Sequence, residues 1–237
     1  MTRNKVYKKI LKAGKPQLAV LIDPDKFNAE LIRLCRSQPV SYFFVGGSQL
    51  KNGNLKKTVS AIKKLSNIPV VIFPGDEKQL CPEADAVLFL SLLSGRNPEY
   101  LIGKQVKAAP LIRKKNLESI STAYLLLEGK NVSTTQKVTG TRPLINSADI
   151  INTSIAGEML GFKLLYLEAG SGAKASLSSS MIKKVKKAVN LPLLIGGGIN
   201  SAARAQRAIA AGANIIVVGN ALEKDIHLIH KLTPLFK

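Results

Sequence analysis

The sequence predicts a (β/α)8 barrel, an α/β fold built on parallel strands, and three observations carry this prediction. The chain has 237 residues, 46% of them hydrophobic, and its length is close to the roughly 250 residues of such a barrel. Apolar runs of strand length recur about eight times, and amphipathic stretches separate them. The runs are continuously apolar rather than alternating, which is typical of parallel strands buried on both faces.

An open doubly wound sheet also alternates strands and helices, but no G-x-G-x-x-G motif follows the first apolar run. The number of runs, their spacing of roughly 25 residues and the chain length favour the barrel. No linker or low-complexity segment divides the chain. We therefore expect one barrel domain that spans residues 1–237.

The elements follow in chain order. A short basic helix, roughly residues 4–13, precedes the first strand. The eight predicted strands are LAVLID (18–23), SYFFVGG (41–47), IPVVIFPG (68–75), ADAVLFL (84–90), AYLLLEG (123–129), KLLYLEAG (163–170), LPLLIGGGI (191–199) and NIIVVGNAL (214–222). Predicted helices begin near Asn or Ser and end near Gly or Asn, as in NAELIRLCRS, NLKKTVSAIKKLS, SSSMIKKVKKAV and SAARAQRAIAAG.

The composition is strongly basic. The chain has 35 Lys and Arg against 15 Asp and Glu, and a formal charge of +20 favours anionic partners such as phosphorylated substrates or lipid headgroups. Many lysines lie in doublets such as LKKT and IKKL, whose simplest interpretation is a solvated helix face. Nucleic acid is not an expected partner, because aromatic residues make up only 5% and no basic-aromatic stretch that stacks bases is present.

The sequence favours a cytoplasmic protein. The longest apolar runs reach only about half of the roughly 20 residues that a membrane-spanning helix needs. The basic N-terminal stretch lacks the apolar core and cleavage site of a secretory signal. Cys35 and Cys81 have no metal or disulfide spacing, so both are expected to be reduced thiols. Lysines near the barrel mouth would allow peripheral contact with anionic headgroups at the inner membrane face.

A (β/α)8 barrel carries its active site at the C-terminal ends of the strands, so the polar residues there are the candidates. Asp23 and Asp25 follow the first strand, and Ser48 follows the second after two glycines. Mg²⁺ prefers oxygen ligands, usually one or two carboxylates with substrate phosphate oxygens. Asp23 and Ser48 are therefore the predicted metal ligands. The alternative is that Asp23 or Asp25 only caps a helix that begins near Phe27.

The last two predicted strands end in glycine-rich loops. GGGI (196–199) follows the seventh strand, and Gly219 and Asn220 follow the eighth. Glycines expose backbone N–H groups, and phosphate-binding barrels hold their phosphate after strands seven and eight. The two loops predict a phosphate site, although tight turns alone also require glycine.

The sixth predicted strand ends in the stretch YLEAGSGA (166–173). We expect Gly170, Ser171 and Gly172 beside the same phosphate, with Ser171 as a hydrogen-bond donor. Glu168 is expected to face the organic part of the phosphorylated compound, because a carboxylate binds phosphate poorly but accepts a proton from a hydroxyl. The alternative is an ion pair between Glu168 and one of the many lysines.

These motifs together resemble the geranylgeranylglyceryl phosphate / heptaprenylglyceryl phosphate synthase family. The resemblance covers nearly the whole chain in LIDPDK, VGGS, FPG, SLLSGRNPEYLIGKQVKAAP, SIAGEMLGFKLLYLEAGSGA, IGGGI and VVGNALEKD, and YLEAGSGA is its most specific part. It implies an enzyme, a Mg²⁺-dependent phosphoglycerol geranylgeranyltransferase on a modified TIM barrel. Such a prenyltransferase joins the 3-hydroxyl of sn-glycerol 1-phosphate to a polyprenyl diphosphate, here most simply geranylgeranyl diphosphate, and releases diphosphate.

The resemblance also implies roles for individual residues. Asp23 and Ser48 would hold the Mg²⁺ that binds the prenyl diphosphate, and residues 97–110 would border the prenyl channel. We expect Glu168 to be the catalytic acceptor for the glycerol hydroxyl, and family members are similar in forming homo-oligomers. Glycerol 1-phosphate would be bound by Tyr166, Leu167, Glu168, Ala169, Gly170, Ser171, Gly172, Gly197, Gly198, Gly219 and Asn220.

One alternative enzyme remains open from the residues alone. Another phosphate-binding barrel, an isomerase or a synthase acting on a phosphorylated small molecule, would share the loops after strands seven and eight. It would not require Asp23 together with Ser48 as a site for a metal and a diphosphate.

Overall fold

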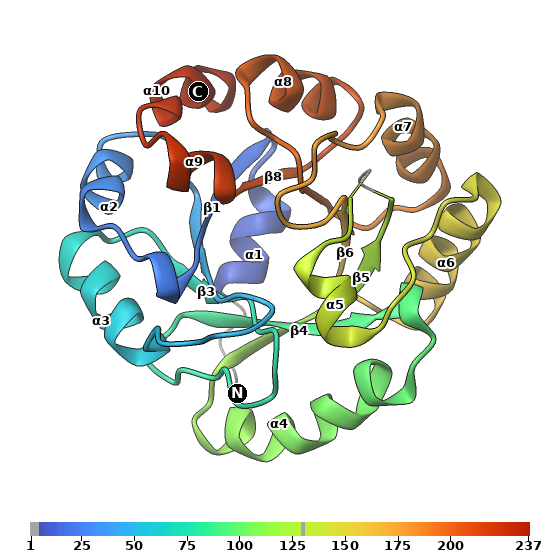
Figure 1. Ribbon diagram of the computed structural model, residues 1–237, viewed down its shortest axis with the longest axis horizontal. Helices are drawn as coiled ribbons and strands as arrows, with labels where there is room; N and C mark the ends of the chain where they lie inside the picture. The colour runs from blue at the N-terminus through green and yellow to red at the C-terminus, as the bar shows by residue number, and fades with distance from the viewer. Residues whose placement is uncertain (1–4, 129–130) are drawn as a thin grey trace.

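Each of the eight apolar runs forms a strand in the computed structural model, which describes residues 5–128 and 131–237 (Figure 1). The strands pair in chain order, all parallel, and β8 closes on β1. The strands are β1 (Gln17–Ile22), β2 (Tyr42–Val45), β3 (Val70–Ile72), β4 (Ala86–Leu92), β5 (Glu118–Leu126), β6 (Leu164–Glu168), β7 (Leu193–Gly196) and β8 (Ile215–Val218). The predicted (β/α)8 barrel is confirmed.

Helices surround the barrel in Figure 1. The α-helices are α1 (Lys5–Lys12), α2 (Ala29–Arg36), α3 (Leu55–Leu65), α4 (Lys104–Lys114), α5 (Thr134–Thr139), α6 (Ser147–Met159), α7 (Ser179–Ala188), α8 (Ala202–Ala210), α9 (Asn220–Lys224) and α10 (Leu228–Leu232). Short 3-10 turns are η1 (Pro24–Lys26), η2 (Leu93–Gly95) and η4 (Thr233–Phe236), and η3 (Glu99–Gly103) is a π-helical turn that leads into α4. Side-chain oxygens of Asn28, Asn54, Ser178 and Ser201 cap α2, α3, α7 and α8, as the sequence pattern predicts.

The basic N-terminal helix closes the end of the barrel opposite the C-terminal ends of the strands. The Glu118 carboxylate at the start of β5 accepts hydrogen bonds from the backbone N–H groups of Val6 (2.9 Å) and Tyr7 (2.8 Å) on α1. This contact satisfies donors in the first turn of α1 that have no partner within the helix. The other end of the barrel is thereby left as the place for an open site.

The barrel has two apolar layers because side chains on a strand alternate between its two faces. Leu165 and Leu167 of β6 pack outward in the layer between strands and helices. Tyr166 of the same strand faces inward, with Tyr124 beside it on β5. The inner layer therefore carries the hydroxyls of Tyr124 and Tyr166. Glu168, two residues further along β6, places its carboxylate nearer the barrel mouth.

Some predicted boundaries are wrong. β5 begins at Glu118, five residues before the predicted start at 123. Its first residues include polar ones, which an apolar run does not indicate, and Glu118 accepts a hydrogen bond from the backbone of α1. β3 spans only three residues, since Phe73, Pro74 and Gly75 turn away at the barrel mouth. Residue 4, predicted to start the first helix, and residue 129, predicted to end the fifth strand, lie outside the described residues.

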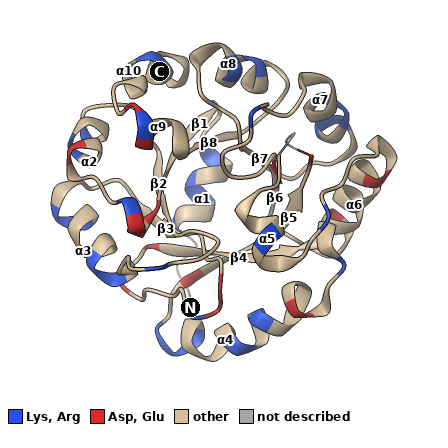
Figure 2. Cartoon of the chain, in the orientation of Figure 1, with Lys and Arg blue, Asp and Glu red and all other residues tan. Residues whose placement is uncertain are grey.

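Lysine doublets lie on the outer helices α3 and α7, and one more lies on α1 inside the ring of helices (Figure 2). The basic residues of α3 are exposed, as are those of α7 except the half-buried Lys186, while apolar residues of these helices such as Val59 and Val185 are buried against the barrel. The interpretation of the doublets as solvated helix faces is confirmed. No helix among residues 5–128 and 131–237 is long and apolar enough to cross a membrane.

Candidate active site

A polar cavity of about 390 Å³ opens at the C-terminal ends of the strands. The loops after β1, β2, β6, β7 and β8 line it, and it brings together most of the predicted site residues: Asp23, Ser48, Tyr166, Glu168, Ser171, Gly172, Gly197, Gly198, Gly219 and Asn220. Three predicted residues are not part of its lining. Leu167 packs outward among the core side chains, Ala169 is buried, and Gly170 contributes its N–H to Glu168.

Glu168 is held deep in this cavity. Its side chain lies at the end of β6, the residue is only 6% exposed, and its Oε1 accepts a hydrogen bond from the Gly170 N–H at 3.0 Å. Burial raises the pKa of Glu168 to about 7, although the Tyr166 hydroxyl and the Gly170 N–H oppose the shift. Glu168 is in none of the ion pairs between described residues, so the structure does not support the alternative of a lysine partner. A carboxylate with this pKa can accept a proton near neutral pH.

Asp23 and Asp25 have different surroundings. Asp23 Oδ1 accepts a hydrogen bond from the Asp25 N–H at 3.0 Å and so caps the 3-10 turn η1. Asp25 turns away and accepts from the backbone N–H groups of Lys51 (2.9 Å), Asn52 (2.8 Å) and Gly53. These hydrogen bonds, led by that from Lys51, lower the pKa of Asp25. Asp25 therefore anchors the loop after β2, and α2 is capped instead by Asn28.

The chemistry of Asp23 and Ser48 fits a hard cation. A Cβ atom added to Gly47 would lie 3.7 Å from Asp23 Oδ1, so the loop that carries Ser48 passes close to this carboxylate. Burial raises the pKa of Asp23, and a cation beside it would offset that cost. No group of three or more His, Cys, Asp or Glu gathers in the described part of the chain. The two oxygens can therefore supply only part of a coordination shell, as is usual for Mg²⁺ with a phosphorylated ligand.

The loop after β7 packs directly on Glu168. Gly197 and Gly198 adopt left-handed backbone conformations, with φ of 79° and 68°. A Cβ atom on Gly197 would lie 2.6 Å from Glu168 Oε1, so only glycine fits there. Between the loops after β6 and β8, the Ser171 hydroxyl donates to Asn220 Oδ1 at 2.9 Å. Three loops thus converge within reach of one small polar ligand.

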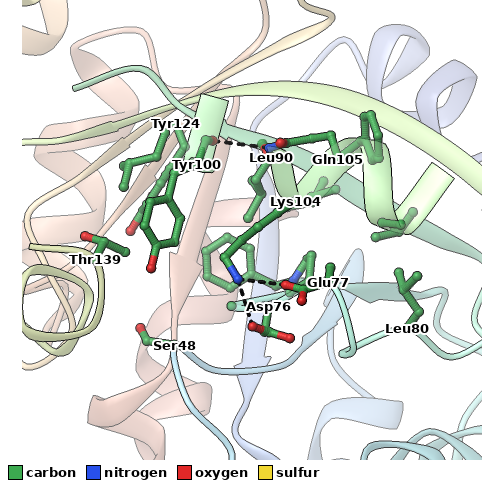
Figure 3. Close-up of a pocket in the computed structure, with 18 of the residues that line it drawn as sticks. Ser48, Asp76, Glu77, Leu80, Leu90, Tyr100, Lys104, Gln105, Tyr124 and Thr139 are labelled. Carbon is green, nitrogen blue, oxygen red and sulfur yellow. Dashed lines mark hydrogen bonds and ion pairs between the residues drawn. The ribbon is translucent and has the colours of Figure 1, made fainter. Parts of the chain in front are cut away.

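A second, apolar cavity of about 100 Å³ lies between β3, β4 and α4. Figure 3 shows Tyr100, Lys104 and Gln105 of the η3–α4 segment around it. The predicted segment 97–110 therefore does border an apolar cavity. The two cavities share five lining residues, Gly47, Ser48, Phe73, Tyr124 and Thr135, so they meet at the predicted metal ligand Ser48.

Sequence reasoning missed several residues at this junction. Thr135 lies 3.2 Å from Ser48 through their hydroxyl oxygens, and Phe73 packs 5.4 Å from Tyr166 between ring centroids. Thr135 belongs to α5, a helix of six residues that no amphipathic stretch indicates. Its one signal in the sequence is the capping box formed by Ser133 and Gln136.

Known proteins with similar sequence and structure share this architecture. The profile of the PcrB family matches residues 11–233. A geranylgeranylglyceryl phosphate synthase from Chitinophaga pinensis is 45% identical, over 97% of this chain and 94% of its own, and one from Pyrococcus furiosus is 40% identical, over 86% and 83%.

Among solved structures, the (S)-3-O-geranylgeranylglyceryl phosphate synthase from Thermoplasma acidophilum in complex with sn-glycerol-1-phosphate superposes with a TM-score of 0.89 at 29% identity. The match covers 100% of this chain and 97% of that one. The resemblance found in the sequence motifs, and with it the prediction of an enzyme of that family, is confirmed. By sequence and by fold, the chain belongs to the PcrB family.

Proposed function

We propose that this chain is a prenyltransferase that joins the 3-hydroxyl of sn-glycerol 1-phosphate to a polyprenyl diphosphate, with geranylgeranyl diphosphate as the expected donor. The observation that carries the proposal is that the polar cavity, which Glu168 lines, meets an apolar cavity at Ser48. Such a shape suits a small polar acceptor and a long apolar donor whose reacting ends must meet. The names of the relatives, and the glycerol phosphate in the Thermoplasma acidophilum structure, support the same acceptor.

Glycerol 1-phosphate would bind with its phosphate at the loops after β6, β7 and β8. Gly172, Gly197, Gly198 and Asn220 all line this part of the cavity, and backbone N–H groups of such glycine-rich loops can bind a phosphate. The glycerol end would then extend toward Glu168. In the reaction, the 3-oxygen of glycerol forms a bond to C1 of the prenyl group, the bond from C1 to the diphosphate oxygen breaks, and Glu168 accepts the hydroxyl proton.

Asp23 and Ser48 would hold a Mg²⁺ ion. When bound, the ion supplies positive charge to the diphosphate, which makes it a better leaving group. Asp23 would provide the carboxylate and Ser48 the hydroxyl, whose oxygen lies 3.2 Å from that of Thr135. The apolar tail of the donor would lie toward Leu90 and Ala108, on the far side of Phe73 and Tyr124.

The experiment that tests the proposal incubates the protein with radiolabelled glycerol 1-phosphate, Mg²⁺ and prenyl diphosphates of several lengths. We expect label in the organic extract with at least one diphosphate and none without it. An isomerase or synthase acting on another phosphorylated compound would leave all the label in the aqueous phase. The diphosphate that gives the highest kcat/KM identifies the preferred chain length.

Two further properties belong to the proposal. The charge of +20 supports peripheral contact with anionic membrane surfaces, where the apolar donor resides, and binding to anionic liposomes should weaken as salt rises. The family resemblance supports a homo-oligomer, which size-exclusion chromatography with light scattering tests directly.

A further inference from the structure

A chain of polar contacts crosses the rim of the polar cavity. Lys26 Nζ, in the turn after β1, lies 2.8 Å from Glu223 Oε2 on α9. The same Glu223 oxygen accepts a hydrogen bond from Asn220 Nδ2 at 3.3 Å, and Asn220 Oδ1 accepts one from Ser171 at 2.9 Å. These contacts join the loops after β1, β6 and β8 on the side of the cavity where Asp23 lies.

The cavity does not share the positive charge of the protein as a whole. Among its described lining residues, the cations are Lys26 and Lys224, whereas the carboxylates are Asp23, Glu168 and Glu223. While Glu223 engages Lys26, two anionic substrates that bind together have only Lys224 of this lining and the Mg²⁺ proposed at Asp23 and Ser48 to offset their charge. Any cation that can change partner within the cavity therefore matters for binding.

Lys26 is placed to change its partner within the polar cavity. It ends the 3-10 turn η1 that Asp23 caps, and its N–H donates to the Asp23 carbonyl oxygen at 2.9 Å. The backbone of Lys26 is thus tied to the strand end that carries the predicted metal ligand, and its side chain starts three residues after Asp23. The Lys26 side chain is 54% exposed, although that of Glu223 is only 18% exposed, so water reaches the ammonium and can help it to change partner. A diphosphate oxygen offers more negative charge to the ammonium than one carboxylate does.

We propose that Lys26 is a binding residue for the diphosphate of the prenyl donor and that Glu223 holds its ammonium at the cavity rim until the diphosphate takes the place of the carboxylate. This inference rests on the proposed function of the same cavity. Lys26 then adds positive charge to the diphosphate from the turn that Asp23 caps. Glu223 keeps its hydrogen bond from Asn220 and takes Lys26 back when diphosphate leaves, which favours release of that product.

Binding of inorganic pyrophosphate in the presence of Mg²⁺, measured by isothermal titration calorimetry, tests this assignment without requiring turnover. We expect Lys26→Ala to weaken binding about tenfold, because a charge-assisted hydrogen bond is lost, and Lys26→Arg to restore most of it. Glu223→Gln should tighten binding severalfold, since it keeps a partner for Asn220 but no longer competes for Lys26. Lys183→Ala, on the exposed face of α7, is the control for loss of one positive charge.

Steady-state kinetics identify the substrate that Lys26 contacts. Lys26→Ala should raise the KM for the prenyl diphosphate and leave the KM for glycerol 1-phosphate unchanged. Unaltered pyrophosphate binding in Lys26→Ala, no binding to the wild-type protein, or a rise only in the KM for glycerol 1-phosphate would each overturn the assignment. If the protein forms the ether product but Lys26→Ala changes neither pyrophosphate binding nor the KM for the prenyl diphosphate, this inference alone is refuted. If pyrophosphate binding depends on Lys26 but no ether product forms, the proposed prenyl transfer is refuted.

Discussion

Ser48 Oγ lies 3.2 Å from Thr135 Oγ1, and this contact joins the loop after β2 to α5 where the polar and apolar cavities meet. Thr135 thereby limits the directions in which the Ser48 hydroxyl can point. If Ser48 is a metal ligand, loss of this contact should weaken metal binding by about the strength of one hydrogen bond, or roughly 1 kcal/mol. We predict that Thr135→Val raises the Mg²⁺ concentration for half-maximal activity about fivefold.

The measurement is a Mg²⁺ titration of initial rates at saturating substrates. Thr135→Ser keeps the hydroxyl and should behave like the wild-type enzyme, which separates the hydrogen bond from the packing of α5. Equal titration curves for Thr135→Val and the wild type would remove Thr135 from any role at the metal.

The contact between Ser48 and Thr135 is also an example of a feature that the sequence does not predict. The strands could be predicted because continuous apolar runs are typical of parallel strands buried on both faces. Glu168 could be placed at the barrel mouth because the active site of such a barrel lies at the C-terminal ends of its strands. Thr135 could not, because its partner lies 87 residues away and its helix has six residues. The pair of Lys26 and Glu223 joins loops 197 residues apart, a relation that only closure of β8 on β1 creates.

The apolar cavity could be predicted only in outline. The family resemblance predicts that residues 97–110 border a prenyl channel, whereas the hydrophobic pattern of this segment alone does not. A π-helical turn at Glu99–Gly103 changes which residues of this segment face inward. A hydrophobic pattern with the period of an ordinary α-helix does not predict such a turn.

Asp23 is the carboxylate on which the metal proposal depends. Asp23→Asn keeps an oxygen that can cap η1 but removes the negative charge that attracts a cation. We predict that this variant needs at least about tenfold more Mg²⁺ for half-maximal activity or has no measurable activity. Asp149→Asn, which removes an exposed carboxylate on α6, is the control. An unchanged Mg²⁺ titration in Asp23→Asn would mean that the metal binds elsewhere or is not used.

To act as the proposed acceptor of the glycerol proton, Glu168 must be ionised. Because burial raises its pKa to about 7, kcat/KM should rise with pH up to about 7 and fall about tenfold per unit below it. Glu168→Gln should lower kcat by about 10²- to 10⁴-fold while calorimetry still detects binding of glycerol 1-phosphate.

The phosphate of the substrate also titrates, near pH 6 for a phosphate monoester. The residual activity of Glu168→Gln should therefore keep an inflection near pH 6 and lose the one near pH 7. Turnover like that of the wild type in this variant, or persistence of the upper inflection, contradicts the assignment of Glu168 as the proton acceptor.

The same carboxylate should make the fold less stable as pH rises. Glu168 has an ordinary pKa near 4.5 in the unfolded chain and about 7 in the folded protein. Between these values the folded protein keeps a proton that the unfolded chain has lost, so the free energy of unfolding decreases as pH increases. Glutamine does not titrate and avoids this cost.

We predict that the free energy of unfolding of Glu168→Gln, relative to the wild type, increases by on the order of 2 kcal/mol between pH 4.5 and pH 8. Urea denaturation followed by circular dichroism at several pH values measures this difference. Glu30→Gln removes an exposed carboxylate on α2 and controls for the loss of charge alone. A constant difference between Glu168→Gln and the wild type across this range would show that Glu168 has no raised pKa.

Lys104 ties α4 to the loop after β3 along one wall of the apolar cavity (Figure 3). Its Nζ lies 2.9 Å from Asp76 Oδ2 and 2.7 Å from Glu77 Oε2. The cavity of about 100 Å³ is smaller than the roughly 300–1,000 Å³ of most ligand pockets. The prenyl chain of the proposed donor would therefore need the η3–α4 segment to move outward, and we expect the two ion pairs of Lys104 to resist that movement.

Lys104→Met removes both ion pairs and keeps an apolar stem against the cavity. The carboxylates are partly exposed, so we expect the pairs to contribute about 1 kcal/mol together, and amide hydrogen exchange of residues 99–108 should become about fivefold faster. Lys107→Met is a matched control in the same helix, because Lys107 pairs with Glu99 within the segment (2.7 Å) rather than across the cavity wall. If both variants exchange at the same rate, Lys104 does not restrain α4, and the segment must be held by its apolar contacts with β4.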